Sequence, residues 1–289
     1  MQTWGIRSLK MHCPSACIDT PELDAALLLA ETLQISREEL ITRADDETSE
    51  RDRLKYQDLL DRRRSGECIA YILGRKEFCR LEFTVKAGVL VPRPDTEILL
   101  EAALEYINST AVKDDRVLSV LDLCTGSGAL AISLKKERPL LSVTASDISA
   151  LALETAALNA GRLLPGLPDE SPVNLVHSDL FENLPDRYDI IISNPPYIPS
   201  GEIPNLAPEV QLEPLLALDG GGDGLALIRR IIVQAPDHLL PGGVVLLEAA
   251  PEQMRQIKDL LANNGFARVR LHKDLAGRER VISAGLASL

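Results

Sequence analysis

From residue 117 onward, short apolar runs alternate with segments in which apolar residues recur at helical spacing. The runs show no regular alternation with polar residues, which is typical of strands buried on both faces of a parallel sheet. The segments between them carry apolar residues three and four positions apart, as helices that cover such a sheet do. The pattern therefore predicts a doubly wound α/β sheet. Its strands are expected at 117–123, 142–146, 173–177, 188–193 and 243–249.

The two ends of the chain differ from this pattern. Residues 1–72 predict a small helical domain, in which Ser36 and Glu39 have the spacing of a capping box. Residues 73–94 hold β-forming residues between turn residues and predict a hairpin that links two domains. Residues 95–289 would form the main domain. Its last stretch, "ARVRLHKDLAGRERVISAG", predicts an antiparallel hairpin at the edge of the sheet.

Charge and composition narrow the classes of function. The 289 residues include 43 acidic and 31 basic side chains, which give a formal charge of −12. Proteins that grip long stretches of nucleic acid usually have the opposite balance, so we expect no direct nucleic-acid partner. No apolar run is long enough to cross a bilayer, and the first residues lack a secretory pattern. We therefore expect a cytoplasmic protein that does not contact membranes.

The five cysteines do not predict a structural cross-link or a metal centre. Their number is odd, no C-x-x-C pair occurs, and no group of histidines accompanies them. Disulfide frameworks and zinc sites need such pairs or clusters. We expect no metal.

Polar or glycine-rich residues follow four consecutive strands of the predicted sheet. Ligands of doubly wound sheets bind at the carboxyl ends of the strands, so these residues predict one shared site. They are Cys124, Thr125, Gly126, Ser127 and Gly128 after the first strand, Asp147 after the second, Asp179 and Leu180 after the third, and Asn194, Pro195, Pro196 and Tyr197 after the fourth.

The glycine turn and the acidic residue predict a nucleotide-like ligand. Gly126 and Gly128 allow a sharp turn into the next helix and a close approach of a ligand to the main chain. Asp147 follows about twenty residues later, where a carboxylate can accept from two ribose hydroxyls. "GSGALA" also fits the G-x-G-x-x-A pattern of nicotinamide dehydrogenases, so this pair alone leaves the nucleotide open.

The tetrapeptide "NPPY" at 194–197 favours methyl transfer to a planar nitrogen. Pro195 and Pro196 have no N–H, so the loop offers carbonyl acceptors without competing donors. Asn194 adds a side-chain oxygen and Tyr197 a flat ring. Such a clamp suits an amide or exocyclic amine, whose two N–H groups are held while its lone pair is aimed at a methyl sulfonium.

These motifs resemble the S-adenosylmethionine-dependent methyltransferases, and most closely the bacterial release factor glutamine methyltransferases. The matching stretches are "AYILGRKEF", "LVPRPDTE", "LDLCTGSGALAI", "SNPPYIP", "LEPLLALDGGGDGL" and "KDLAGRERVI", spread over nearly the whole chain. The resemblance implies a methyltransferase-type Rossmann-like domain preceded by a helical domain that helps recognise the substrate. The implied reaction moves a methyl group from S-adenosylmethionine to the glutamine amide nitrogen of the Gly-Gly-Gln motif in class I peptide chain release factors.

Carried over by position, the resemblance assigns roles to the residues after the strands. The residues from Cys124 to Gly128 would wrap the methionine part of the cofactor, Asp147 would hold its ribose, and Leu180 beside Asp179 would contact its adenine. Asn194 would touch both cofactor and substrate. Asn194, Pro195, Pro196 and Tyr197 would clamp the glutamine amide, with Asn194, Pro195 and Tyr197 as catalytic residues.

The sequence departs from the family at two places. Cys124 stands where glycine is common, a spelling frequent in the sister enzymes that methylate a glutamine of a large-subunit ribosomal protein. Ala249 and Ala250 follow the strand glutamate where glycine is often found. The Cys124 spelling makes a ribosomal-protein glutamine methyltransferase the first alternative, whereas the two alanines bear only on the local loop shape. An adenine-N6 nucleic-acid methyltransferase is the second alternative, because enzymes that methylate adenine share "NPPY".

Overall fold

The computed structural model describes residues 18, 20–43, 46–111, 116–166 and 173–286. They form two compact units, Met1–Arg75 with Asn205–Glu213, and Lys76–Pro204 with Pro214–Leu289. Cys13 and Cys17 lie outside the described residues. None of the described helices combines the length and apolar character that a bilayer crossing requires.

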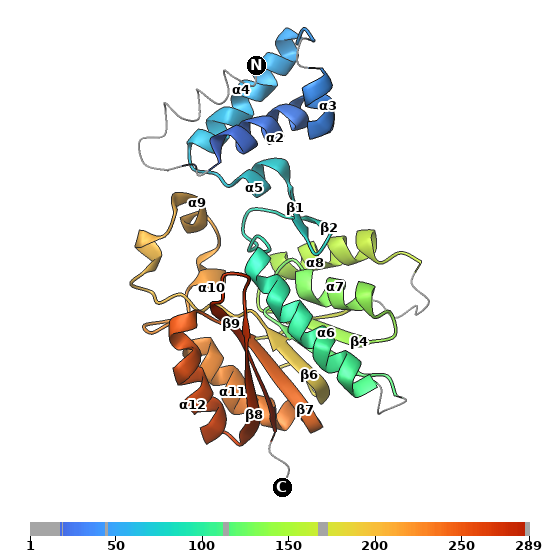
Figure 1. Cartoon of the computed structure of the whole chain (residues 1–289), viewed down its shortest axis with the longest axis vertical. Coiled ribbons are helices and arrows are strands. Elements are labelled where there is room, and N and C mark those ends of the chain that lie inside the picture. Colours follow the sequence, from blue (N-terminus) through green and yellow to red (C-terminus); the bar gives the residue numbers. More distant parts are fainter. Residues whose placement is uncertain (1–17, 19, 44–45, 112–115, 167–172, 287–289) are drawn as a thin grey trace. The chain divides into compact units, whose positions relative to one another are not determined.

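The first unit is built from short helices, of which those in residues 20–64 are drawn in blue in Figure 1. Ser36 and Glu39 form the predicted capping box: the Glu39 N–H donates to Ser36 Oγ (3.1 Å) and the Ser36 N–H to Glu39 Oε2 (2.8 Å). The leucines and alanines of these helices share one apolar core around the fully buried Tyr56. The helices are α2 (Pro21–Leu33), α3 (Arg37–Thr42), α4 (Glu50–Arg64), α5 (Ile69–Leu73) and α9 (Pro208–Gln211).

A buried ion pair lies inside this unit. Arg63 Nε donates to Asp24 Oδ2 over 2.7 Å, and each of these two residues is at most 5% exposed. A second guanidinium nitrogen, Nη2, lies 2.7 Å from Glu209 Oε2 in the segment 205–213. This segment groups with the N-terminal helices, whereas its sequence position is inside the predicted main domain.

Removing Arg63 should destabilise the helical unit. In Arg63→Ala the Asp24 carboxylate stays buried without its cation, which costs about 3–5 kcal/mol in comparable cases. We expect a loss of that order in the free energy of unfolding, measured by urea denaturation and helical circular dichroism. Arg53→Ala on the same helix is the control, because Arg53 pairs with Glu50 at 4.0 Å on the exposed surface. Equal stability of the two variants would contradict the expectation.

The second unit begins with a hairpin and contains a seven-stranded sheet. The hairpin of β1 (Arg75–Phe78) and β2 (Leu81–Thr84) turns at Cys79 and Arg80, which both have positive φ, as a two-residue hairpin turn requires. The large sheet has the order β5-β4-β3-β6-β7-β9-β8. Its strands are β3 (Ser119–Leu123), β4 (Ser142–Asp147), β5 (Asn174–His177), β6 (Tyr188–Ser193), β7 (Leu239–Glu248), β8 (Phe266–Lys273) and β9 (Glu279–Leu286).

The pairing confirms the predicted doubly wound sheet with its terminal antiparallel hairpin. The first five strands are parallel, and β9 pairs antiparallel with both β7 and β8. From β3 the chain proceeds outward to β4 and β5, and then returns to place β6 on the other side of β3. The order of strands reverses between β3 and β6, and ligands of such folds bind at that point.

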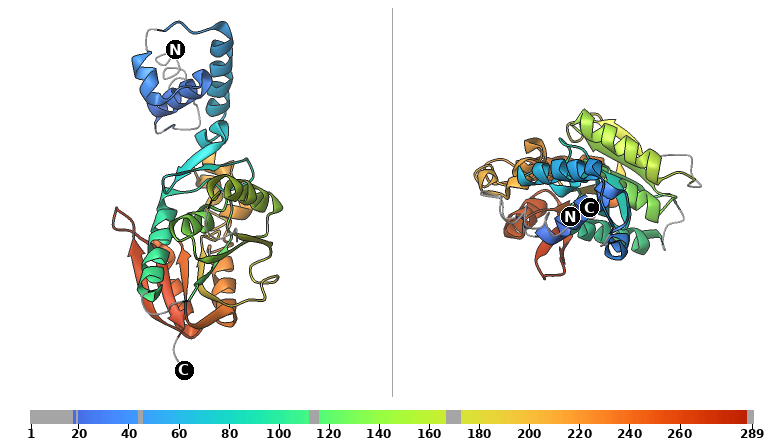
Figure 2. Two further views of the ribbon diagram at one scale, coloured as in Figure 1. Left: turned by 90° about the vertical axis from the view of Figure 1, so that its right-hand side faces the viewer. Right: turned by 90° about the horizontal axis from the view of Figure 1, so that it is seen from above.

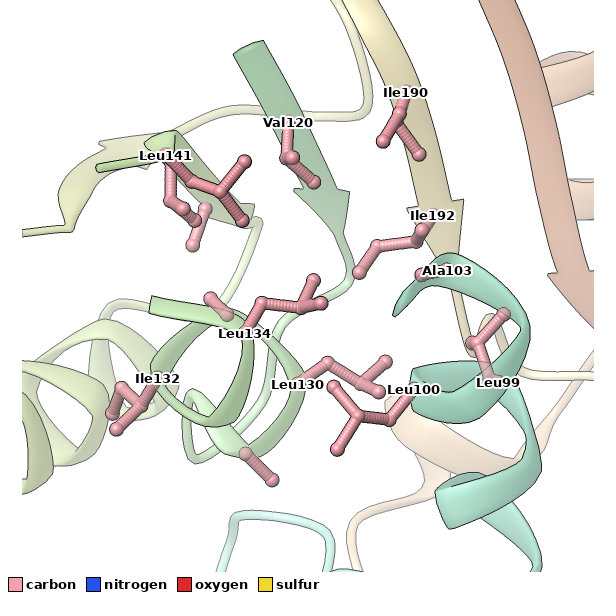
Figure 3. Close-up of a cluster of buried hydrophobic side chains, with 14 of the residues drawn as sticks. Leu99, Leu100, Ala103, Val120, Leu130, Ile132, Leu134, Leu141, Ile190 and Ile192 are labelled. Carbon is pink, nitrogen blue, oxygen red and sulfur yellow. The ribbon is translucent and has the colours of Figure 1, made fainter. Parts of the chain in front are cut away.

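Helices cover both faces of the sheet (Figures 1 and 2). Val120, Ile190 and Ile192 point to one apolar cluster, which Figure 3 shows with side chains of α6 and α7. Leu121 and Ile191, one position along, belong to the cluster beneath α11 and α12. This explains why the strands lack polar alternation. The helices are α6 (Glu97–Ala111), α7 (Ala129–Glu137), α8 (Ala150–Leu163), α10 (Leu215–Leu218), α11 (Ala226–His238) and α12 (Met254–Asn263), with 3-10 turns η1 (Pro94–Thr96), η2 (Ile203–Asn205) and η3 (Pro251–Gln253).

Candidate active site

A cavity opens at the carboxyl ends of the parallel strands, within the second unit. Nine of the predicted site residues line it: Cys124, Thr125, Gly126, Ser127, Asp147, Asp179, Leu180, Asn194 and Pro196. The rest of its wall is largely apolar and comes from Phe78, the segment 88–93, and the residues around α10 such as Pro214, Leu216 and Ala217. The four strand ends therefore meet at one hollow, as their sequence positions predict.

The turn after β3 is shaped by residues with left-handed backbone. Gly126 has φ +57°, and a Cβ added to it would meet nothing within 4 Å. Gly128 has φ +81° but serves packing, because its Cβ would lie 2.8 Å from Ile132 Cδ1 and 3.0 Å from Ala156 Cβ. Cys124 has φ +59°, which explains structurally why glycine suits this position. The open side of Gly126 lets a ligand reach the main chain.

Asp122, at the buried end of β3, holds this turn from below. Its Oδ2 accepts from Thr125 Oγ1 (2.6 Å) and from the Ala131 N–H (3.2 Å). Burial raises the pKa of Asp122 to about 7. Asp122 had no predicted role, although an aspartate inside an otherwise apolar strand is itself a signal.

Asp147 joins the turn to the second strand. Its Oδ2 accepts from the Gly126 N–H (2.8 Å) and its Oδ1 from the Ser149 N–H (2.9 Å). Burial raises the pKa of Asp147, and these backbone donors oppose the rise. Each carboxylate oxygen has a second lone pair that can accept from a ligand hydroxyl.

The third strand contributes a fixed loop. Leu180 has φ +50°, and its carbonyl accepts from Ser178 Oγ (2.8 Å). The neighbouring Asp179 carboxylate is paired with Arg230 over 2.9 Å. Asp179 and Leu180 both line the cavity, so this loop supplies one acidic and one apolar group to its wall.

Asn194 presents an acceptor next to the cavity. Its Nδ2 donates to Thr96 Oγ1 over 3.0 Å, and its Oδ1 has no hydrogen-bond partner among the described residues. Pro195 and Pro196, which follow, are buried and cannot donate. The amide is thus turned so that its donor faces the protein and its oxygen is available to a ligand.

Tyr197 lies behind this acceptor instead of in the cavity wall. Its hydroxyl donates to Glu248 Oε1 (3.3 Å), and its carbonyl accepts from Gln253 Nε2 (2.8 Å). Burial raises the pKa of Tyr197 well above its usual range. Pro195, like Tyr197 and Gly128, is absent from the residues that line the cavity.

The loop after Tyr197 is pinned to the glycine-rich segment 218–224. The Ile198 N–H donates to the Leu218 carbonyl (3.0 Å), and the Gly220 N–H donates back to the Ile198 carbonyl (2.9 Å). Ser200 Oγ donates to Asp219 Oδ1 (2.7 Å). The "LALDGGGDGL" stretch, which had no assigned role, thus fixes the course of the chain after "NPPY".

Two functional candidates were missed by sequence reasoning. Thr96 in "PRPDTE" lines the cavity and contacts Asn194, and Glu248 ends β7, the fifth parallel strand. Glu248 is 1% exposed, and burial raises its pKa to about 7. A lone carboxylate at the end of an apolar strand was the available signal.

A substitution in the glycine turn tests whether a ligand approaches the main chain at Gly126, and a control variant separates this effect from backbone strain. Gly126→Ala adds a Cβ that points into open space, with the backbone in the left-handed region. We expect weaker binding of a nucleotide-like ligand by about tenfold, because the methyl group takes up space where the ligand approaches. The measurement is a dissociation constant by calorimetry with S-adenosylhomocysteine.

The control for this variant is Gly277→Ala. Gly277 has φ +79° and likewise meets nothing within 4 Å, but it lies in the turn between β8 and β9. Both variants should lose about 1–2 kcal/mol of stability from backbone strain, and only Gly126→Ala should lose affinity. Equal affinities in the two variants would remove the turn from the binding site.

Comparisons with known proteins find matches in both parts of the chain. Residues 2–74 match the family model of the PrmC N-terminal domain, and residues 100–210 match the methyltransferase small domain. A solved methyltransferase from Pyrococcus furiosus shares the fold, with a TM-score of 0.51 and 20% identity over 81% of this chain and all of that one.

Curated relatives match nearly the whole length. The release factor glutamine methyltransferase of Burkholderia pseudomallei is 42% identical over 261 residues, which cover 89% of this chain and 90% of the relative. The protein of the same name from Clostridium acetobutylicum is 39% identical over 265 residues, 90% of each chain. At this identity and coverage, the chain belongs to the release factor glutamine methyltransferase family.

Proposed function

We propose that this protein transfers the methyl group of S-adenosylmethionine to the side-chain amide nitrogen of the Gly-Gly-Gln glutamine in class I peptide chain release factors. The proposal rests on family membership and on one observation above all. Asn194 presents a free amide oxygen beside two prolines that cannot donate, at the rim of a cavity with a nucleotide-type glycine turn.

The residues of the cavity fit a sulfonium nucleoside. Gly126 leaves open space where the methionine part would lie, and Asp147 has lone pairs for the two ribose hydroxyls. Leu180 would contact the adenine. When bound, the cofactor supplies an electrophilic methyl group.

The chain's own groups would orient the glutamine amide. The Asn194 oxygen and the Pro195 carbonyl can each accept one N–H, which fixes the plane of the substrate amide. Accepting both hydrogens moves electron density back to nitrogen and aims its lone pair at the methyl group. Pro196 closes the wall beside this position, and Tyr197 would support the clamp from behind through its bond to Glu248.

The remaining parts of the chain have proposed roles consistent with this reaction. The N-terminal helical domain, placed at residues 1–72 from the sequence, would help recognise the release factor. The hairpin at 73–94 would link it to the methyltransferase domain at 95–289. Translation factors are cytoplasmic, so we place the enzyme in the cytoplasm, and its charge of −12 supports a protein substrate over nucleic acid.

A methyl-acceptor assay tests this function. The protein is incubated with methyl-labelled S-adenosylmethionine and, separately, with a purified class I release factor, a ribosomal large-subunit protein fraction, and DNA. We expect label in the release factor alone, and none when its Gly-Gly-Gln glutamine is changed to glutamate. Label confined to the ribosomal fraction or to DNA would overturn the proposal in favour of a sister enzyme.

A further inference from the structure

Behind Asn194 lies a chain of hydrogen bonds that ends in a buried carboxylate. Asn194 Nδ2 donates to Thr96 Oγ1 (3.0 Å), and the Thr96 side chain lies near enough to Glu248 to lower the pKa of its carboxyl group. Tyr197 Oη also donates to Glu248, at Oε1 (3.3 Å). Thr96 comes from the turn before α6 and Glu248 from the end of β7. Residues from distant parts of the sequence thus converge on one amide.

The oxygen and NH₂ ends of an asparagine amide have nearly the same shape. The hydrogen bonds to neighbouring groups therefore determine which end faces the ligand. A hydroxyl has one hydrogen, so Thr96 can donate in one direction only. An ionised carboxylate is an acceptor only and therefore draws that hydrogen toward Glu248. The Thr96 oxygen is left to accept, and only the NH₂ end of Asn194 can satisfy it.

We infer that Glu248 and Thr96 are positioning residues that set the orientation of the Asn194 amide, so that its oxygen and not its nitrogen faces the substrate. This inference rests on the proposed function, since a donor facing the cavity would repel the N–H groups of a substrate amide. The carboxylate acts through Thr96 and does not touch the reacting atoms.

A role in orienting Asn194 accounts for the burial of the Glu248 carboxylate in apolar surroundings. Glu248 is 1% exposed, and its Oε2 has no partner among the described residues. Such burial is costly for a charged group. A glutamine there would replace one carboxylate oxygen by an NH₂ group, which donates. That group would donate to Thr96 or Tyr197 and could reverse the chain.

Protonation of Glu248 would also reverse the direction in which Thr96 donates its hydrogen bond. Burial raises its pKa to about 7, the hydrogen bonds from Thr96 and Tyr197 lower it, and of the nearby charges Asp95 raises it and Arg280 lowers it. Below that pH the carboxyl group gains a hydrogen and can donate to Thr96, which then turns to donate to Asn194. Methyl transfer should therefore fall as pH is lowered through about 7.

The test compares Glu248→Gln, Thr96→Val and Thr96→Ser in the full-length protein. We expect kcat for release factor methylation at pH 8.5 to fall about ten- to a hundredfold in the first two. The dissociation constant for S-adenosylhomocysteine should stay within about twofold. Thr96→Ser keeps the hydroxyl and should retain kcat within about threefold. Glu248→Gln should also lose the acidic limb of the pH profile near 7.

A readout without substrate separates this inference from the proposed function. In the ¹H–¹⁵N spectrum, one side-chain amide proton of Asn194 should exchange slowly in the wild type and in Thr96→Ser, and fast in Thr96→Val. Absence of release factor methylation by the wild type would refute the function, whatever this spectrum shows. Full kcat in Thr96→Val, equal losses in Ser and Val, or an unchanged pH limb in Glu248→Gln would refute the inference.

Discussion

Replacing Asn194 by alanine is expected to lower kcat for methyl transfer by about 10²–10³-fold, the range found when a single orienting hydrogen-bond group is removed from an enzyme site. The variant loses the Oδ1 acceptor, so only the Pro195 carbonyl remains to hold one of the two N–H groups of the substrate amide. The measurement is a single-turnover rate with labelled cofactor and purified release factor.

Cofactor affinity should change much less than turnover in this variant. The glycine turn and Asp147 remain in place, so the dissociation constant for S-adenosylhomocysteine should rise by no more than about threefold. Asn263→Ala, an exposed residue at the end of α12, serves as the control and should behave as the wild type. Equal losses in turnover and affinity would mean that Asn194 binds cofactor and does not position the substrate.

Replacing Gly224 by alanine is expected to lower kcat by about a hundredfold through displacement of the "NPPY" loop. A Cβ at residue 224 would lie 2.2 Å from the Tyr197 carbonyl oxygen and 2.4 Å from Gln253 Nε2. Both separations are too short for a real Cβ contact, so the atoms around it must move. Gln253 Nε2 and the Tyr197 carbonyl are also hydrogen-bonded to each other at 2.8 Å, so a shift of one disturbs the other. The chain at Tyr197 must therefore shift, and Asn194 lies only three residues away.

Gly222→Ala is the matched control for this variant. It lies in the same loop, and its Cβ would meet nothing within 4 Å. Its kinetics should match the wild type, and cofactor affinity should be preserved in both variants. A Gly224→Ala enzyme with normal kcat would show that the course of the chain after Tyr197 does not govern the reaction.

The elements with strong local patterns could be predicted from the sequence. The strand expected at 188–193 is observed as Tyr188–Ser193, because six buried positions in a row leave little choice of structure. The terminal hairpin and the capping box at Ser36 were also confirmed. In each case the signal lies within a few residues of the element itself.

The prediction failed where short segments depend on their neighbours. Helix α5 (Ile69–Leu73) runs one residue past the boundary expected at 72 and is closed by Gly74 at φ +70°. The boundary expected between residues 94 and 95 falls inside a 3-10 turn, because Pro94 begins a turn that leads directly into α6. Proline at the first position of a helical turn loses no hydrogen bond, so the residue that ends some helices can also begin one.

The residues of the site also fall into those that the sequence predicts and those that it does not. Residues directly after strands were found because their position in the fold follows from their position in the sequence. Thr96 and Glu248 were not, since their contact with Asn194 and Tyr197 joins segments that are 98 and 51 residues apart. No local pattern encodes such a meeting.

Residues 205–213 affect the design of a fragment that contains only the sheet-containing unit. The chain leaves the sheet-containing unit after Pro204 and rejoins it at Pro214. Glu209, on this excursion, meets Arg63 in the helical unit. A fragment made by deleting the first 75 residues would therefore keep a stretch stripped of its packing partners. A transferase fragment without the helical unit should therefore also lack residues 205–213.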